Sequence, residues 1–211
     1  MSEKAMTGVI DYGAGNLGSV MNALARLSIP ARFVQGPEEL NPRLFRGIIL
    51  PGDGHFATAA ESLGGSGYAE AIKDWIKADR PFLGICLGLQ LLFEKSEEAP
   101  PKDGKETPGF ALIRGEVKKF PGRKVPQIGW NQTRIKKNSR LFAGFTGTEF
   151  FYYIHSYYVE PLDTADIAAE ADYYLSYCSA VERGALAAVQ FHPEKSGAAG
   201  LKLLENWSRF C

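Results

Sequence analysis

The sequence predicts an α/β fold with a mainly parallel central sheet, helices flanking that sheet, and added antiparallel strands. In the first half of the chain, short apolar segments alternate with segments whose apolar residues recur at helical spacing. In the second half, segments rich in aromatic and β-branched residues dominate, as in antiparallel strands. The 211 residues are 45% hydrophobic and contain no internal repeat or low-complexity tract, which predicts a single domain over residues 1–211.

The elements of the first half follow from these patterns. Short apolar runs predict strands at residues 7–12, 32–34, 47–50 and 82–85. Apolar residues at helical spacing predict helices at residues 16–27 and 68–78. Alternation of this kind is typical of a parallel sheet that is covered on both faces.

The second half is expected to extend the same sheet. Residues 94–108 are polar and predict an exposed loop. Aromatic and β-branched segments predict antiparallel strands at residues 115–120, 148–160 and 173–182. A short apolar strand at residues 187–191 and a helix at residues 198–210 end the chain.

Charge and composition exclude several classes of partner. The 24 Lys and Arg residues balance 24 Asp and Glu residues, so net charge does not indicate binding to nucleic acid or an anionic membrane. The N-terminus lacks the apolar run of a signal peptide, and no segment approaches the ~20 apolar residues of a membrane helix. We therefore expect a cytoplasmic protein that binds neither nucleic acid nor membranes. Of the three cysteines, Cys178 and Cys211 are expected to be structural, and the odd number does not predict a disulfide framework.

Cys86 has the sequence context of a nucleophile. It directly follows a predicted buried strand, with Gly84 and Gly88 two residues away on either side. A sharp strand-to-helix turn needs glycine at both positions, because it forces the neighbours of the nucleophile close together. The backbone N–H groups after the turn, beginning with Leu87, would favour a thiolate and donate to an oxyanion. The alternative is a small buried hydrophobic residue, which the bracketing glycines disfavour.

A histidine usually activates such a thiol, and His192 is the best placed of the three in this chain. Glu194 lies two residues further on, so its carboxylate can hold one ring nitrogen while the other faces the thiol. The alternative is a histidine at a strand end beside a solvated glutamate, which the context of Cys86 disfavours. His55 and His155 are expected to be structural or adjacent to the substrate.

The turn at residues 52–54, called the oxyanion turn below, is a candidate for an oxyanion hole. Glycines flank Asp53 there, and a flexible turn can present backbone N–H groups to an oxygen that becomes negative. The Asp53 carboxylate would repel that oxygen, so its side chain must point away and only the backbone at Gly52 and Asp53 can act. An ordinary strand-to-helix connection is the alternative.

Two of these segments resemble a known family. GICLGLQLLF around Cys86 and FHPEKS around His192 are similar to the motifs of the class I, triad-type glutamine amidotransferases. The resemblance implies the fold of that family and a glutaminase that hydrolyses L-glutamine through a Cys86, His192 and Glu194 triad and a thioester. It implies neither a metal nor a cofactor. The glutamine site that it implies is lined by Gly52, Gln90, Ser156 and Tyr157.

Further segments resemble one branch of this family over nearly the whole chain. They are VIDYGAGNLGSV, LPGDGHF, PQIGWNQ and YYIHSYY. Members of that branch form heterodimers with a cyclase subunit of the (β/α)8-barrel type. They pass it ammonia for making imidazole glycerol phosphate and an aminoimidazole carboxamide ribotide in histidine biosynthesis. The resemblance implies the same partner here, with an interface at or near Asn16, Trp130, Tyr152 and Lys195.

Other functions are alternatives. GAGNLG matches the glycine pattern of dinucleotide-binding modules, but the region of Gln35, where an acidic residue should hold the ribose, is not acidic until after Gly36 and Pro37. A cysteine hydrolase acting on peptides would have a similar turn at Cys86. Within the amidotransferases, the partner could be a synthase for anthranilate, GMP or formylglycinamidine ribotide. A non-enzymatic interaction subunit is the last alternative, and the complete Cys, His and Glu set argues against it.

Overall fold

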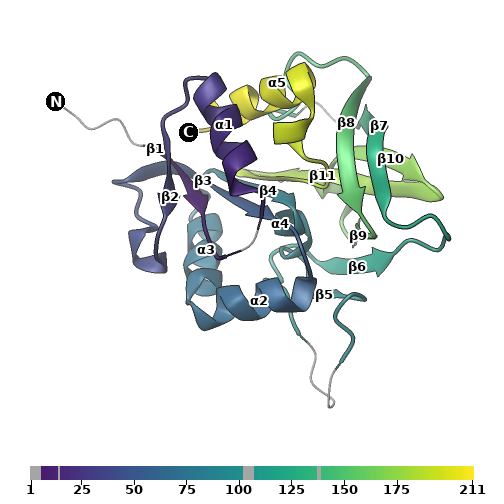
Figure 1. Ribbon diagram of the computed structural model, residues 1–211, viewed down its shortest axis with the longest axis horizontal. Helices are drawn as coiled ribbons and strands as arrows, with labels where there is room; N and C mark the ends of the chain where they lie inside the picture. The colour runs from purple at the N-terminus through teal and green to yellow at the C-terminus, as the bar shows by residue number, and fades with distance from the viewer. Residues whose placement is uncertain (1–5, 14, 102–106, 137–138) are drawn as a thin grey trace.

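A mixed β-sheet, with twelve strands among the residues that the structure describes, runs through both halves of the chain (Figure 1). The computed structural model describes residues 6–13, 15–101, 107–136 and 139–211. Parallel strands form one half of the sheet and antiparallel strands form most of the other.

The parallel half of the sheet places the catalytic candidates at one edge. Its strands pair in the order β2 (Ala31–Val34), β1 (Met6–Ile10), β3 (Phe45–Gly52), β4 (Phe82–Cys86) and β12 (Leu186–Val189). In this register Gly52 pairs with Cys86, and Ile85 pairs with Val189. The oxyanion turn, Cys86 and the residues after β12 therefore meet at the carboxyl ends of neighbouring strands.

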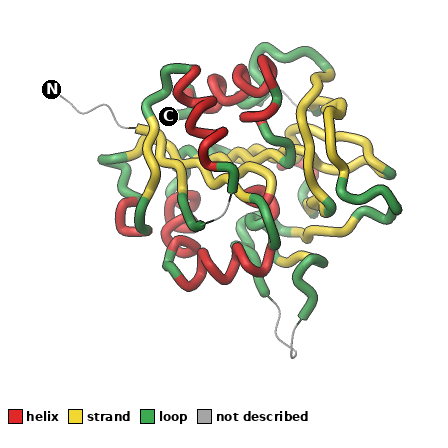
Figure 2. The backbone as a smooth tube through the Cα atoms, viewed as in Figure 1, coloured by secondary structure: helices red, strands yellow, loops and turns green. Residues whose placement is uncertain are grey.

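Helices cover both faces of this parallel half (Figure 1, Figure 2). Alternate strand residues point to opposite faces. Val9 and Ile49 pack in one core cluster with α1 (Leu17–Arg26) and α5 (Gly197–Ser208). Ile10 and Ile48 pack in the other with α2 (Phe56–Gly65) and α3 (Tyr68–Lys77). Burial of both faces explains why the strand sequences are almost continuously apolar.

The antiparallel half continues from β12 and ends in a hairpin. Its main path runs through β11 (Leu175–Arg183), β10 (Ile167–Tyr173), β7 (Gln127–Ile135) and β8 (Thr148–His155). A branch from β11 contains β9 (Tyr157–Pro161), β6 (Gly115–Lys119) and β5 (Lys95–Ser96). Single turns of 3-10 helix lie at η1 (Pro37–Glu39), η2 (Thr164–Asp166) and η3 (Pro193–Lys195).

The predicted fold class is confirmed, and several element predictions needed correction. The sequence patterns did not predict α2, β7 or β10. The segment 148–160 was predicted as continuous, but it breaks at Ser156 into β8 and β9, which belong to different branches of the sheet. The predicted loop at 94–108 contains the short strand β5, and its residues 102–106 lie outside the described residues.

Among the residues described, no helix combines the length and the apolar character that crossing a membrane requires.

Candidate active site

Cys86 occupies a strained turn between β4 and α4 (Leu87–Gln90). Its φ of 54° and ψ of −106° form a conformation that residues with a side chain rarely adopt. The flanking glycines permit the turn: a Cβ on Gly84 would lie 2.6 Å from the Gly88 carbonyl oxygen, and a Cβ on Gly88 would overlap the Leu50 carbonyl oxygen. This is the geometry of a nucleophile elbow.

The helix after Cys86 is shorter than the sequence suggests. Residues 87–93 are compatible with a helix, but α4 ends at Gln90. The carbonyl groups of Leu91 and Phe93 instead accept hydrogen bonds from the backbone N–H groups of Phe110 and Ala111, at 2.7 and 3.2 Å. A helix of one turn has little macrodipole, so only the local N–H groups after Cys86 are left to stabilise negative charge.

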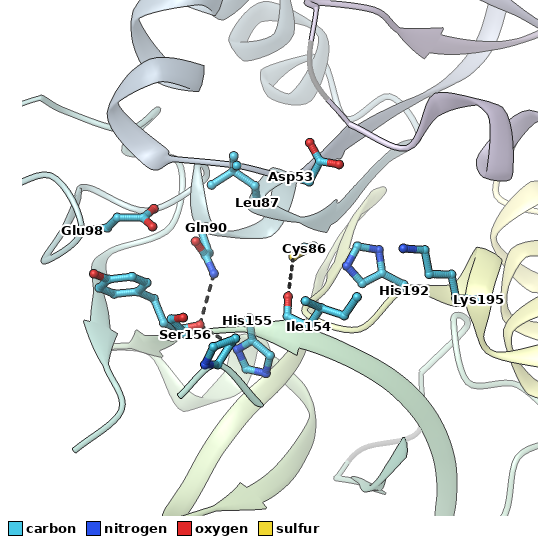
Figure 3. Close-up of a pocket in the computed structure, with 13 residues that line it drawn as sticks. Asp53, Cys86, Leu87, Gln90, Glu98, Ile154, His155, Ser156, His192 and Lys195 are labelled. Atoms are coloured by element: carbon cyan, nitrogen blue, oxygen red, sulfur yellow. Dashed lines mark hydrogen bonds between the residues drawn. The ribbon is translucent and has the colours of Figure 1, made fainter. Parts of the chain in front are cut away.

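A cavity of about 370 Å³ lies at the end of β4, between the oxyanion turn, the break between β8 and β9, and the residues that follow β12 (Figure 3). Gly52 and Glu194 do not line it, but each contacts a residue that does, since Gly52 pairs with Cys86 and Glu194 bonds to His192. Asn16, Trp130 and Tyr152 lie outside its wall. The predicted site residues that the structure brings together around the cavity are Asp53, Cys86, Leu87, Gln90, Ser156, Tyr157, His192 and Lys195.

His192 and Glu194 form a buried pair next to the thiol. The Nδ1–H of His192 donates to Glu194 Oε1 at 2.8 Å, and the side chain of Glu194 is 1% exposed. Burial by itself would lower the pKa of His192. The hydrogen bond and charge of Cys86, followed by those of Glu194, outweigh burial and raise this pKa to about 10. His192 can therefore carry a proton at neutral pH, held in place by the Glu194 carboxylate.

Two groups that the sequence did not indicate contact the sulfur of Cys86. The S–H group donates to the Ile154 carbonyl oxygen at 3.7 Å, and Nε2 of Gln190 donates to Sγ at 3.5 Å (Figure 3 shows the first contact). Gln190 is fully buried. A single amide inside the apolar segment 187–191 was the signal that could have identified it.

The side chain of Asp53 is held away from the sulfur. Its Oδ1 accepts a hydrogen bond from the backbone N–H of Gly15 at 2.8 Å, and Figure 3 shows the carboxylate directed away from Cys86. This orientation is the one that an oxyanion turn acting through its backbone requires.

The loop at Ser156 is held by hydrogen bonds to one carbonyl oxygen. The Tyr157 carbonyl accepts from Gln90 Nε2 at 3.2 Å and from His155 Nδ1 at 2.7 Å. Burial lowers the pKa of His155 to about 4, so the ring is neutral at physiological pH. His155 therefore lines the cavity as a fixed hydrogen-bond donor. His55 has a different structural role, because its Nδ1 accepts from Ala57 N–H at the start of α2.

Glu98 is a further cavity residue that the sequence did not indicate. Its Oε2 accepts from the backbone N–H of Phe56 at 2.8 Å, and the side chain lies at the end of the cavity opposite His192 (Figure 3). Glu98 lies in the segment predicted as an exposed loop, and a glutamate in such a loop does not by itself indicate a functional site.

Of the residues expected at an interface, Lys195 lines the cavity, whereas Asn16, Trp130 and Tyr152 do not. Trp130 is 56% exposed, and its ring meets the ring of Tyr152 edge-on at 6.1 Å. Pairing of β7 with β8 puts Ile128 and Phe150, 63% and 50% exposed, on the same face. We call Ile128, Trp130, Phe150 and Tyr152 the apolar hairpin face. Asn16 caps α1, with its Oδ1 accepting from Ser19 N–H at 3.3 Å.

Comparison with known proteins agrees with this arrangement of thiol, imidazole and carboxylate. The profile of the family "Glutamine amidotransferase class-I" matches residues 8–209. A protein of Moorella thermoacetica named imidazole glycerol phosphate synthase subunit HisH is 44% identical over 200 residues, which cover 94% of this chain and 92% of the relative. The protein of the same name from Geobacillus kaustophilus is 44% identical over 209 residues, which cover 96% and 95%.

Solved structures share the fold at much lower identity. The PurLQS structure from Thermotoga maritima superimposes with a TM-score of 0.76 at 17% identity, covering 98% of this chain and 99% of that one. A crystal structure of a glutamine amidotransferase gives a TM-score of 0.74 at 19% identity, with 98% of each chain covered. From the profile match and the relatives together, the chain belongs to the class-I glutamine amidotransferase family.

Proposed function

We propose that this chain is the glutaminase subunit of an imidazole glycerol phosphate synthase. It hydrolyses L-glutamine to glutamate and ammonia and passes the ammonia to a cyclase subunit in histidine biosynthesis. The observation that carries the proposal is the meeting of Cys86, His192 and Glu194 at one cavity, in a chain 44% identical to HisH proteins over nearly its full length.

The geometry supports acyl transfer through a thioester. The Cys86 thiolate attacks the carboxamide carbon of glutamine, and the N–H groups after Cys86 and at the oxyanion turn receive the negative oxygen. The C–N bond then breaks as His192 gives its proton to the departing ammonia. Water, deprotonated by His192, attacks the thioester, and the C–S bond breaks to release glutamate. Glu194 orients the ring in both steps.

The polar wall of the cavity suits the amino-acid end of glutamine. Gln90 uses both Nε2 hydrogens within the protein, which leaves its carbonyl oxygen as an acceptor for the substrate. The Glu98 carboxylate complements the substrate α-ammonium group, and Ser156 and Tyr157 complete this end of the site. Each bond change is accounted for by side chains and water, so the proposal includes no metal or cofactor.

A partner beside the cavity would receive the product. Most ammonia becomes ammonium in neutral water and is then no longer a nucleophile, so direct transfer to a synthase protects it. The apolar hairpin face offers a docking surface next to the site, because Ile154 of β8 lines the cavity while Ile128 and Trp130 of β7 are exposed. We propose a (β/α)8-barrel cyclase as the partner in a heterodimer, located in the cytoplasm, where a reactive thiol stays reduced.

Cys86→Ser tests the proposal in the complex with a cyclase subunit. Product formation from glutamine should be lost, because serine in this site is a far weaker nucleophile, while added ammonium salt should still support the cyclase reaction. The His55→Asn variant, altered outside the triad, should retain both activities. Loss of both activities in Cys86→Ser would show that the cysteine serves folding or assembly instead. A partner other than a cyclase would reject the assignment to histidine biosynthesis.

A further inference from the structure

We infer that Gln190 is the side-chain amide donor that stabilises the thiolate of Cys86, and that the Tyr157 carbonyl oxygen sets its orientation through Gln90. Ile85 of β4 pairs with Val189 of β12. Gln190 directly follows Val189, so it lies next to Cys86, which directly follows Ile85. This inference rests on the proposed function, but the reactivity of the Cys86 thiol can be measured independently of glutaminase activity.

The orientation of both amides follows from a single backbone acceptor. A carbonyl oxygen can only accept hydrogen bonds, so Gln90 must turn its NH₂ group toward Tyr157 O, at 3.2 Å. The second hydrogen of that NH₂ group is then directed to Gln190 at 3.1 Å, so Gln190 must present its oxygen there. The NH₂ group of Gln190 is thereby left facing Sγ of Cys86 at 3.5 Å.

A second donor, His155, also binds the Tyr157 carbonyl oxygen that begins this series of hydrogen bonds. His155 lies 2.7 Å from the same Tyr157 oxygen, through Nδ1, and can approach it only as an N–H donor. Its Nε2 lies 3.3 Å from the hydroxyl of Tyr177, which is itself buried. The carbonyl is therefore held by a rigid, buried arrangement, and a flip of the two amides would leave carbonyl oxygens facing one another.

The donor is needed because another group opposes ionisation of the sulfur. The Ile154 carbonyl accepts from the S–H group at 3.7 Å and so favours the neutral thiol. Once the proton leaves, that carbonyl dipole has its negative end toward a negative sulfur. The N–H group of Gln190 has the opposite polarity. Because Gln190 is fully buried, water cannot replace its N–H group if the side chain is changed.

Alkylation of Cys86 by iodoacetamide measures thiolate content directly. The thiolate forms a C–S bond as iodide leaves. After alkylation of the full chain, tryptic digestion and peptide mass spectrometry separate this adduct from adducts at Cys178 and Cys211, which lie on other peptides. Gln190→Glu keeps an acceptor toward Gln90 and removes the donor toward sulfur. We expect the pH midpoint for alkylation of Cys86 to rise by about one unit or more, with a rate about tenfold lower at neutral pH.

Two further variants bracket this result. Gln190→Met removes donor and acceptor at similar volume without adding charge, and its midpoint should also rise, by less than that of Gln190→Glu. Gln35→Glu makes the same change at an exposed position and should match the unaltered protein. An unchanged midpoint in Gln190→Glu, in a protein whose circular dichroism shows it folded, would overturn the inference.

A measurement on the unaltered side chain covers the case in which the variants do not fold. With ¹⁵N in the glutamine side chains, the Gln190 NH₂ resonance should shift as Cys86 titrates, and this shift should be absent in Cys86→Ser. A Gln190 NH₂ resonance that does not shift as Cys86 titrates would also overturn the inference. If these shifts occurred in a protein without glutaminase activity, only the proposed function would fail.

Discussion

The backbone N–H of Gly15 donates to Oδ1 of Asp53 at 2.8 Å. This hydrogen bond joins the glycine-rich loop before α1 to the oxyanion turn after β3, across 38 residues of sequence. It also gives Gly15 a role other than binding a phosphate, which was the alternative use of the GAGNLG pattern. Gly15, which directly precedes Asn16, therefore contacts the turn beside Cys86 through this hydrogen bond.

Replacing Asp53 should leave the chemistry largely intact. Only the backbone of residue 53 is proposed to act on the oxyanion, so Asp53→Val should keep glutaminase kcat/KM within about tenfold of the unaltered protein. Asp53→Asn retains an acceptor for the Gly15 N–H and serves as the matched control. A much larger loss in Asp53→Val alone would show that the carboxylate has a role in catalysis. Steady-state kinetics with glutamine, in the presence of the partner, makes the comparison.

Buried His155 should make the protein sensitive to mild acid. A histidine in the unfolded chain titrates near 6.5, whereas burial lowers the pKa of His155 to about 4 in the folded state. Between these values the unfolded chain binds more protons, so the free energy of unfolding falls as the pH falls. This group accounts for a loss of roughly 2 kcal/mol between about pH 7 and pH 5.

Denaturant unfolding at several pH values tests this dependence. In His155→Asn the part of the slope that comes from this group should disappear. His55→Asn is the control, because the exposed His55 only caps α2 and asparagine can also cap a helix. His192 has the opposite effect, because its pKa is raised to about 10 and its contribution to stability is lost as the pH rises. Both variants retain His192. Equal slopes in His155→Asn and the unaltered protein would contradict the prediction.

A charge on the apolar hairpin face should weaken binding of the partner. Ile128 is 63% exposed beside Trp130, and Ile128→Lys places an ammonium group where we propose that apolar surface is buried. We expect the Kd for the cyclase subunit to rise by about tenfold or more, measured by isothermal titration calorimetry. Leu162→Lys changes a residue of similar exposure, 65%, away from this face and should leave the Kd unchanged. Equal effects of the two substitutions would argue against this docking surface.

Much of the fold could be predicted because both faces of the parallel strands are buried. Such strands are continuously apolar, and the helices that cover them have one apolar stripe, so β1, β4, α1 and α3 follow from local pattern. In the antiparallel half, the hydrophobic pattern of the sequence predicts the strands less clearly. Exposed and buried residues mix along β7, whose burial is set by its neighbours β8 and β10 rather than by its own sequence.

The candidate triad was predicted from two short segments taken together, the one around Cys86 and the one around His192. A nucleophile elbow needs glycines at particular distances from Cys86, and an oriented base needs a carboxylate close to His192, so the residues that supply the chemistry are encoded over a few positions. The groups that surround the Cys86 sulfur are instead determined by contacts between distant segments. Gln190 donates to Cys86 from 104 residues away, and Gln90 bonds to Tyr157 from 67 residues away. Such contacts arise only when strands distant in the chain lie side by side. The local sequence can single out Gln190 as one amide in an apolar segment, but it cannot show that this amide contacts Cys86.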